Sequence, residues 1–262
     1  MKIGNKWAKH EALKKDVALR RHVPEARRMS RNSLASMLKK YRMVYVKPLN
    51  GSRGVGVMKV EAVGSGLRLH DGVRARTFSD FTAGYAAVLR AAKGKPYLVQ
   101  RGIGLSRYGG RPFDIRVVVQ RLPKGQWTVT GWVGRVARQG KIVTNGSQGG
   151  AIYPVDRLLS GSVPLVNRMK RIGLQTARRL HRYYPGLVEI GLDLAVDRSR
   201  RLWILEANTS PDPCPFTKLP DRRMLQRIIR YGGAWGIRYK LHCMKARRGI
   251  TASTQKTRSR RA

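Results

Sequence analysis

The stretch EIGLDLAVDRSRRLWILEAN, residues 189–208, decides the fold of this chain. Its apolar residues fall in two runs, 187–196 and 202–207, around a polar turn, and this pattern predicts a β-hairpin. The chain has 55 Lys and Arg but only 14 Asp and Glu, so acidic residues are scarce. Four of these acids lie in the hairpin: Glu189, Asp193, Asp197 and Glu206.

The expected register of the hairpin brings two of the acids together. A turn centred between Ser199 and Arg200 places Asp193 directly opposite Glu206, where β-carbons lie about 5 Å apart. Like charges at that distance repel unless a cation lies between them. Asn208 is on the same strand face as Glu206, so two carboxylates and an amide oxygen converge, which suits Mg²⁺ bound together with phosphates. A solvated acidic edge is the alternative, and a one-residue slip would separate the acids.

The composition is that of a basic globular protein. Over 262 residues the formal net charge is +41, the isoelectric point is near 11.6, and 42% hydrophobic residues suffice for a core. Such a charge attracts anionic partners, for example an acidic polymer. The C₂H₂, RNP and KH signatures are missing from the sequence, so no specific nucleic-acid binding is expected. A solvated basic surface without a partner explains the charge equally well.

The sequence gives no sign of export or membrane insertion. Its first residues, MKIGNKWAKH, lack the apolar run of a signal peptide, and no segment approaches the length of a membrane-spanning helix. Cys214 and Cys243 show neither a CxxC spacing nor a nearby histidine cluster. We therefore expect a cytoplasmic protein in a reducing compartment.

The order of the predicted elements favours an α+β architecture. Residues 1–42 are expected to form a basic, helical lead-in in which Ser30 or Asn32 caps the helix SRNSLASMLKKY. A basic tail, 245–262, with seven Lys or Arg and no acid, is expected to be disordered. Strands are predicted at 43–47, 55–60, 67–70, 96–100, 113–121 and 127–136. Helices are predicted at 78–93, with Ser79 as its N-cap, at 164–184 and after Pro220.

A glycine-rich loop follows a lysine in VYVKPLNGSRGVGVMKV, residues 44–60. Lys47 ends a predicted strand, and glycines stand at 51, 54 and 56 before the next strand begins. Glycine permits positive φ and close approach of backbone NH groups, so such a loop beside a lysine suits phosphate oxygens. It is neither a Walker A nor a GxGxxG motif. An ordinary wide hairpin that turns at Asn50-Gly51 is the alternative.

Six motifs, in this order, resemble the ATP-grasp enzymes, and more closely the YheC/YheD-type ATP-grasp proteins that are endospore coat-associated in spore-forming Firmicutes. The motifs are Lys47 with its loop, YLVQRGI at 97–103, FDIRVVVQ at 113–120, the run from Arg135 to TNGSQGG, EIGLDL, and LEANTSP. The resemblance covers roughly residues 3–235. It implies an ATP-grasp fold over 43–240, in which a smaller α+β subdomain (about 43–98) and a larger one (about 99–240) clasp a nucleotide.

The resemblance also implies roles for individual residues. Contact with ATP is implied for Lys47, Gly51, Ser52, Gly54 and Gly56 at the phosphates and for Gln100, Arg101 and Ile103 along the adenine edge. A place near the transferred phosphoryl and acyl groups is implied for Arg116, Arg135 and Asn145. Metal binding is implied for Asp193, Glu206 and Asn208, the residues that the hairpin register groups independently.

The implied function is an ATP-dependent ligase that joins a carboxylate to an amine or a related nucleophile through an acylphosphate, in spore coat or cell envelope maturation. It would use one or two Mg²⁺ ions, or Mn²⁺, and the carboxylate and its acceptor are not identified. Some features depart from the family pattern. Only some 40 residues precede the core, Arg28 and Lys39 are the candidates for an upstream phosphate-binding lysine, and Arg53 replaces a small residue in the loop. These departures favour the alternative, a non-catalytic ATP-binding protein of the spore coat that adheres to acidic polymers through its basic surface.

Overall fold

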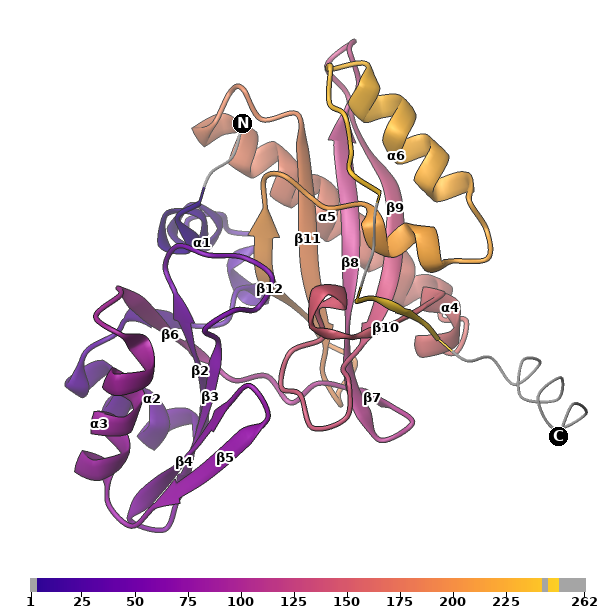
Figure 1. Cartoon of the computed structure of the whole chain (residues 1–262). Helices are drawn as coiled ribbons and strands as arrows, with labels where there is room; N and C mark the ends of the chain where they lie inside the picture. The colour runs from indigo at the N-terminus through magenta and orange to yellow at the C-terminus, as the bar shows by residue number, and fades with distance from the viewer. Residues whose placement is uncertain (1–3, 242–244, 250–262) are drawn as a thin grey trace, which may run out of the picture.

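The computed structural model describes residues 4–241 and 245–249, which form two subdomains, each built on its own β-sheet (Figure 1). In the described residues the smaller sheet has six antiparallel strands in the order β1-β6-β2-β3-β4-β5. Its strands are β1 (Ala26–Arg28), β2 (Met43–Pro48), β3 (Met58–Val63), β4 (Gly66–Asp71), β5 (Arg74–Phe78) and β6 (Tyr97–Arg101). After β6 the chain passes from the smaller subdomain into the larger one.

Two helices, α2 (Arg31–Tyr41) and α3 (Phe81–Ala92), pack on the smaller sheet and share one apolar core with it. Ser30, one of the two predicted caps, closes α2 in a capping box with Ser33. Asp80 caps α3, one residue after the predicted Ser79. Both caps satisfy amide groups that a helix start leaves without partners, so each helix begins at a defined residue.

The larger subdomain is a sheet of seven strands among the described residues, in the order β12-β11-β8-β9-β10-β13, with β7 paired to β8. Helix α5 (Val163–Tyr183) covers one face, and α6 (Arg223–Gly233) covers part of the other (Figure 1). Its strands are β7 (Arg107–Tyr108), β8 (Arg111–Arg121), β9 (Trp127–Val136), β10 (Ala151–Tyr153), β11 (Glu189–Val196), β12 (Leu202–Asn208) and β13 (Arg247–Arg248). Short helices are η1 (Arg20–His22), η2 (Gly146–Gln148), α4 (Val155–Leu158) and η3 (Cys214–Lys218).

The side chains of strand β8 alternate between the two faces of the larger sheet. Those toward α5 are apolar, and those toward the other face are charged near the start of the strand. Side chains alternate along a strand, and every second residue from Phe113 to Val119 joins the core under α5. Asp114 and Arg116 point to the opposite face, as Asp193 does on β11. These charged side chains are buried, and a buried charge is tolerated only when it is paired.

The two ends of the chain differ from their predictions. Within the predicted lead-in, β1 and α2 belong to the smaller subdomain, whereas α1 (Lys6–Lys14) packs against α5 and β12 of the larger one. In the predicted disordered tail, β13 pairs with β10, and residues 250–262 lie outside the described residues. Among the described helices, none is both long and apolar enough to cross a bilayer.

Candidate nucleotide and metal site

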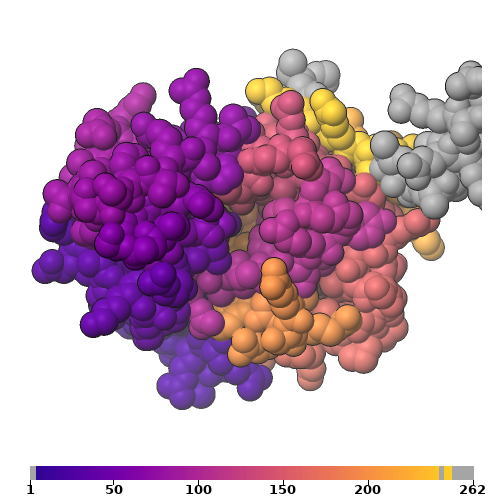
Figure 2. Space-filling view, turned by 90° about the horizontal axis from the view of Figure 1, so that it is seen from below, coloured from indigo at the N-terminus to yellow at the C-terminus, as the bar shows by residue number. Residues whose placement is uncertain are grey.

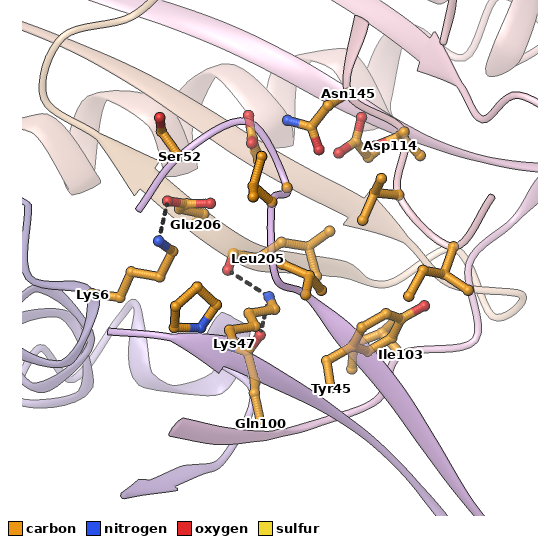
Figure 3. A pocket seen from close by; sticks show the side chains of 18 of the residues that line it. Lys6, Tyr45, Lys47, Ser52, Gln100, Ile103, Asp114, Asn145, Leu205 and Glu206 are labelled. Carbon is orange, nitrogen blue, oxygen red and sulfur yellow. Dashed lines mark hydrogen bonds and ion pairs between the residues drawn. The ribbon is translucent and has the colours of Figure 1, made fainter. Parts of the chain in front are cut away.

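A cleft lies between the two subdomains, and residues from β2 and β6 on one side and β8, β11 and β12 on the other line it (Figures 2 and 3). The cleft brings together nine of the predicted site residues: Lys47, Ser52, Gly54, Gln100, Arg101, Ile103, Asn145, Asp193 and Glu206. The other five do not line it: Gly51, Gly56, Arg116, Arg135 and Asn208. Segments far apart in the sequence therefore meet at one place, as the predicted motifs required.

The glycine-rich loop, residues 49–57, closes one side of this cleft. Gly51, Gly54 and Gly56 have φ angles of 138°, 72° and 72°, values that L side chains rarely adopt. A Cβ atom on Gly54 would lie 2.9 Å from Oδ1 of Asn145. The loop of the smaller subdomain thus touches the larger one, and glycine is required where they meet.

Lys47 spans the floor of the cleft between the two sheets. Its Nζ donates to Oε1 of Gln100 on β6 at 2.5 Å and to the carbonyl oxygen of Leu205 on β12 at 3.4 Å (Figure 3). Burial lowers the pKa of Lys47 to about 8, although attraction to Glu206 acts in the opposite direction. Lys47 is therefore protonated at neutral pH, and these two acceptors are neutral, so a phosphate would improve its electrostatic environment.

The segment after β6 joins the subdomains beside an apolar part of the cleft. The Arg101 guanidinium lies 5.0 Å from the ring centroid of Tyr41 and 4.7 Å from that of Trp203, which restrains the side chain. The amides of Arg101 and Gly102 donate to main-chain carbonyls, whereas no backbone oxygen of the described residues accepts from the amide of Ile103. Ile103 lines the cleft, and contact of its amide with the edge of the adenine base stays a prediction.

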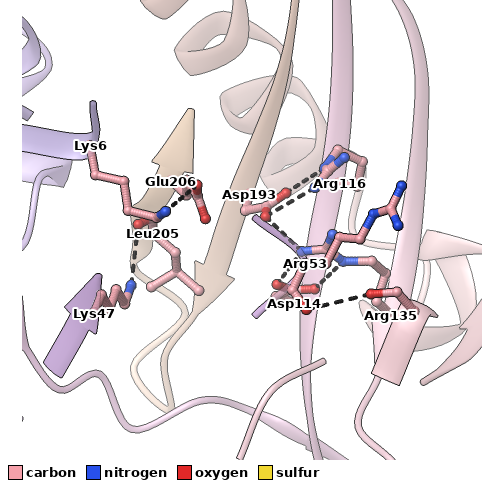
Figure 4. Close-up of polar contacts among 10 residues, drawn as sticks. Lys6, Lys47, Arg53, Asp114, Arg116, Arg135, Asp193, Leu205 and Glu206 are labelled. Atoms are coloured by element: carbon pink, nitrogen blue, oxygen red, sulfur yellow. Dashed lines mark hydrogen bonds and ion pairs between the residues drawn. The ribbon is translucent and has the colours of Figure 1, made fainter. Parts of the chain in front are cut away.

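Four charged side chains form one buried cluster on the polar face of the larger sheet (Figure 4). Arg116 donates to both carboxylate oxygens of Asp193, with Nη2 at 3.1 Å from Oδ2. Arg135 donates to both oxygens of Asp114, at 2.8 and 2.5 Å, and its Nη2 is 3.0 Å from Oδ2 of Asp193. Two acids and two arginines thus neutralise one another in the sheet interior.

The cluster sets the charge of Asp193. Burial alone would raise the pKa of Asp193, but Arg116 and Arg135 outweigh burial and lower that pKa to about 2. The same carboxylates, Asp114 and Asp193, raise the pKa of Arg135 against the effect of burial. Asp193 and Arg135 are therefore both ionised at neutral pH.

The predicted opposition of Asp193 and Glu206 is confirmed, and Asn208 lies opposite Gly191 two residues further along β12. The register shifts by one residue beyond Asp193, at a β-bulge nearer the turn. Lys6 of α1 lies 3.6 Å from Oε1 of Glu206. The two opposed acids thus have separate cations, Lys6 at Glu206 and two arginines at Asp193.

The donor set fits a magnesium ion that shares its coordination with phosphate. In the described parts of the chain, no group of three or more His, Cys, Asp or Glu side chains is arranged to hold a metal alone. Asp193, Glu206 and Asn208 would supply two carboxylates and one amide oxygen, and Mg²⁺ usually takes one or two carboxylates together with substrate phosphates. The metal role of the three residues stays a prediction.

Comparison with known proteins places this arrangement in a family. Residues 1–234 match the family described as YheC/D like ATP-grasp. The chain belongs to the YheC/D-like ATP-grasp family. The endospore coat-associated protein YheD of Bacillus subtilis (strain 168) is 29% identical over 223 residues, 81% of this chain and 49% of YheD. YheC of the same organism, also endospore coat-associated, is 25% identical over 219 residues, 80% of this chain and 60% of YheC, so the chain spans less than two thirds of either relative.

Solved ATP-grasp structures share the fold of this YheC/D-like chain. N5-carboxyaminoimidazole synthase from Aspergillus clavatus, in complex with ADP and its aminoimidazole ribonucleotide, has a TM-score of 0.54 at 11% identity over 94% of this chain and 54% of that one. The D-alanine-D-alanine ligase from Coxiella burnetii has a TM-score of 0.51 at 14% identity over 87% and 56%. The predicted ATP-grasp fold, which is typical of ATP-dependent ligases, is confirmed.

Sequence reasoning missed two charged residues of the YheC/D-like site. Asp114 pairs with Arg135, and its signal was the one acidic residue in the mostly apolar run FDIRVVV, residues 113–119. Lys6 reaches the cleft from α1, whereas the predicted candidates for an upstream lysine, Arg28 on β1 and Lys39 on α2, are exposed and do not line the cleft. No local pattern points to Lys6, because only the packing of α1 against β12 brings it there.

Gly191 on β11 is expected to be required for the position of Arg116. A Cβ atom at Gly191 would lie 2.8 Å from Cβ of Pro211 and 3.3 Å from both Cδ and Nη1 of Arg116. Gly191→Ala should therefore displace Arg116 and lower ADP production about tenfold or more, while ATP affinity stays within about twofold. Steady-state ADP release and calorimetric titration with ATP measure the two effects. The matched control is Gly233→Ala, where a Cβ would meet nothing within 4 Å, and equal losses in both variants would contradict the idea.

Proposed function

We propose that this protein is an ATP- and Mg²⁺-dependent ligase that joins a carboxylate to an amine, or a related nucleophile, through an acylphosphate. The observation that carries the proposal is the buried cluster of Arg116, Arg135, Asp114 and Asp193. Its two acids line the same cleft as Lys47. Burying four charges is costly, and apolar residues of similar size would stabilise the sheet as well or better. Catalysis on an anionic substrate would explain why these four charged residues are present in the sheet.

The proposed reaction has two steps. A carboxylate oxygen of the substrate attacks the γ-phosphorus of ATP, the bond from that phosphorus to the β–γ bridging oxygen breaks, and ADP leaves. The amine then attacks the acyl carbon of the acylphosphate, inorganic phosphate leaves, and the nitrogen loses a proton. Two anions meet in the first step, so Lys47 and Arg116 would supply positive charge on either side of the transferred phosphoryl group. Neither step needs a covalent protein nucleophile.

Asp193, Glu206 and Asn208 would hold Mg²⁺, which would neutralise phosphate charge and orient the transferred group. In the structure Arg116 and Arg135 contact Asp193, and Lys6 is paired with Glu206. Phosphates entering the cleft would attract the same cations and leave the carboxylates available to a metal. We therefore expect tight metal binding only in the presence of nucleotide.

A place in spore coat or cell envelope maturation is supported by the two Bacillus subtilis relatives, both endospore coat-associated. The protein would act in the cytoplasm or at the spore coat. The substrate carboxylate and the acceptor stay unassigned, since the chain spans only part of those relatives.

Trapping of the acylphosphate tests the reaction type. Hydroxylamine should convert the intermediate into a hydroxamate when ATP, Mg²⁺ and a suitable acid are present, with one ADP released per hydroxamate. A panel of amino acids, peptides and dicarboxylic acids serves as the source of the acid. Tight ATP binding without hydroxamate from any acid would favour the non-catalytic coat protein instead.

ATP affinity is expected to fall above pH 8. Attraction to phosphate requires a charged ammonium group, and the pKa of Lys47, lowered to about 8 by burial, means that this charge is present at pH 7 and lost as pH rises through 8. The dissociation constant should rise by up to about tenfold per pH unit above that point. Calorimetric titration from pH 7 to 9.5 measures it.

Lys47→Arg separates this effect from other titrations, because arginine keeps its charge over the whole range. Lys9, whose pKa burial also lowers to about 8, is the other lysine nearby that would titrate. A flat profile in Lys47→Arg assigns the pH dependence to Lys47, whereas an unchanged profile assigns it elsewhere.

A further inference from the structure

The mouth of the cleft carries cations that differ from those inside it. Lys6, which lines the cleft, and the buried Arg116 and Arg135 each have a carboxylate partner, and Lys47 donates to two neutral acceptors. At the mouth stand Arg53 in the glycine-rich loop and Arg138 and Lys141 in the segment 137–150, which joins β9 to β10. In the described part of the chain none of these three forms an ion pair, and neither loop contains an acid.

Contacts of these two loops place Arg53 and Lys141 where the two subdomains meet, and Arg138 belongs to the same segment as Lys141. The hydroxyl of Ser147 and the amide of Gln148 donate to the carbonyl oxygen of Arg53, at 3.5 and 3.4 Å. Residues 142–145 of the same segment line the cleft, and Lys141 Nζ is 3.9 Å from the Cβ position of Gly72 in the β4–β5 turn. The segment thus reaches the smaller subdomain across the boundary between the two subdomains, which Figure 2 shows from below. We call Arg53, Arg138 and Lys141 the cationic rim.

The rim is positioned to act on a substrate that enters the cleft. Arg53 and Arg138 are exposed and Lys141 is partly exposed, so their ammonium and guanidinium groups can meet a ligand without first leaving a carboxylate partner. Uncompensated like charges that gather at one opening attract an anion more strongly than the same charges spread over a surface. The ATP phosphates are already assigned to Lys47 and to Gly51, Ser52, Gly54 and Gly56 of the loop, so the side chains of the rim are available to a second anion.

We propose that the acid activated in this cleft carries several carboxylates, as an acidic peptide segment does, and that the cationic rim binds those that do not react. The inference rests on the proposed ligase function, which requires one carboxylate of this substrate at the γ-phosphate of ATP. The rim would bind an acid more tightly the more carboxylates that acid carries next to the reacting one. Salt should weaken this selection because the rim is exposed.

The test compares two blocked, fluorescently labelled hexapeptides, one of six glutamates and one of five glutamines and a single glutamate. Their binding is measured by fluorescence anisotropy in the presence of Mg²⁺ and a non-hydrolysable ATP analogue. The wild-type protein should bind the six-glutamate peptide roughly tenfold or more tightly than the other at low salt. The rim variant Arg53→Gln/Arg138→Gln/Lys141→Gln should lose that preference.

A matched control removes the same charge elsewhere. Arg168, Arg171 and Arg178 are exposed on α5, which covers the face of the larger sheet opposite the cleft cluster. Changing these three to Gln should leave the preference intact. The proposal would be overturned if the wild type showed no preference for the six-glutamate peptide. It would also be overturned if the rim variant kept this preference, or if both triple variants lost it equally. Equally tight, rim-dependent binding of a single-stranded oligonucleotide of the same charge would also overturn it. Melting curves verify that all variants fold.

Binding and turnover are read separately, so the two proposals can fail separately. Rim-dependent binding of the six-glutamate peptide, without hydroxamate from any acid, would reject the ligase and keep the rim as an anion site. Hydroxamate formation that is equally efficient with both peptides, and unaffected in the rim variant, would keep the ligase and reject the rim.

Discussion

Replacement of Glu206 by Gln is expected to lower ADP production by about a hundredfold or more and to weaken the requirement for Mg²⁺. Glutamine keeps the shape of the side chain but removes one of the two opposed carboxylates. The ion pair with Lys6 is lost at the same time, which leaves an extra positive charge near the phosphates. ATP affinity measured without metal should therefore fall little, or rise. Magnesium titrations of ADP release and of ATP binding measure the two effects.

The matched control for this variant is Glu61→Gln. Glu61 lies on β3 and pairs with Lys59 at 2.7 Å, so the same change removes the same charge from an ion pair outside the cleft. Turnover and metal dependence should be unchanged there. Unchanged turnover and metal dependence in Glu206→Gln as well would rule out the metal assignment.

Local pattern sufficed to predict much of the fold. The strands of the acidic hairpin, the long helix α5 and the loop after β2 follow from hydrophobic period and glycine positions, and all lie close to their predicted places. The predicted opposition of Asp193 and Glu206 depends on the β-bulge as well as on the turn. Beside the turn Leu194 pairs with Ile204, and this register alone would place Asp193 opposite Leu205. The local pattern did not predict the bulge that shifts the pairing to Glu206.

Other parts of the site depend on contacts between distant segments. Strand β1 has three residues, and its partner among the described strands is β6, about 70 residues later, so local sequence gives little sign of it. Lys6 reaches the cleft because α1 packs against β12 and α5. The cluster of Asp114 with Arg135 depends on the β8–β9 register, in which the two residues are direct partners. In each of these three cases the residues meet only in the tertiary structure, so the local sequence does not predict the contact.

Arg116→Ala is expected to abolish hydroxamate trapping while ATP binding persists. The arginine contacts Asp193 and would face the γ-phosphate, so its removal takes away positive charge when the phosphoryl group moves. It also leaves two buried acids with one arginine, which should lower the free energy of unfolding by about 3–5 kcal/mol. Chemical denaturation measures the second effect, and the control Arg121→Ala removes an arginine from the far end of the same strand, outside the cleft.

Arg116→Lys separates the loss of chemistry from the loss of stability. Lysine restores a positive charge near Asp193, so most of the unfolding free energy should return. Its ammonium group is a point charge, however, and lacks the rigid planar pair of donors with which the guanidinium binds an anion. If the arginine acts on the transferred phosphoryl group, Arg116→Lys should be folded, bind ATP and form hydroxamate at least tenfold more slowly than the wild type. Full recovery of trapping together with stability would show that Arg116 acts only by neutralising Asp193, and the stabilisation of the moving phosphoryl group would then have to come from Lys47 and the metal.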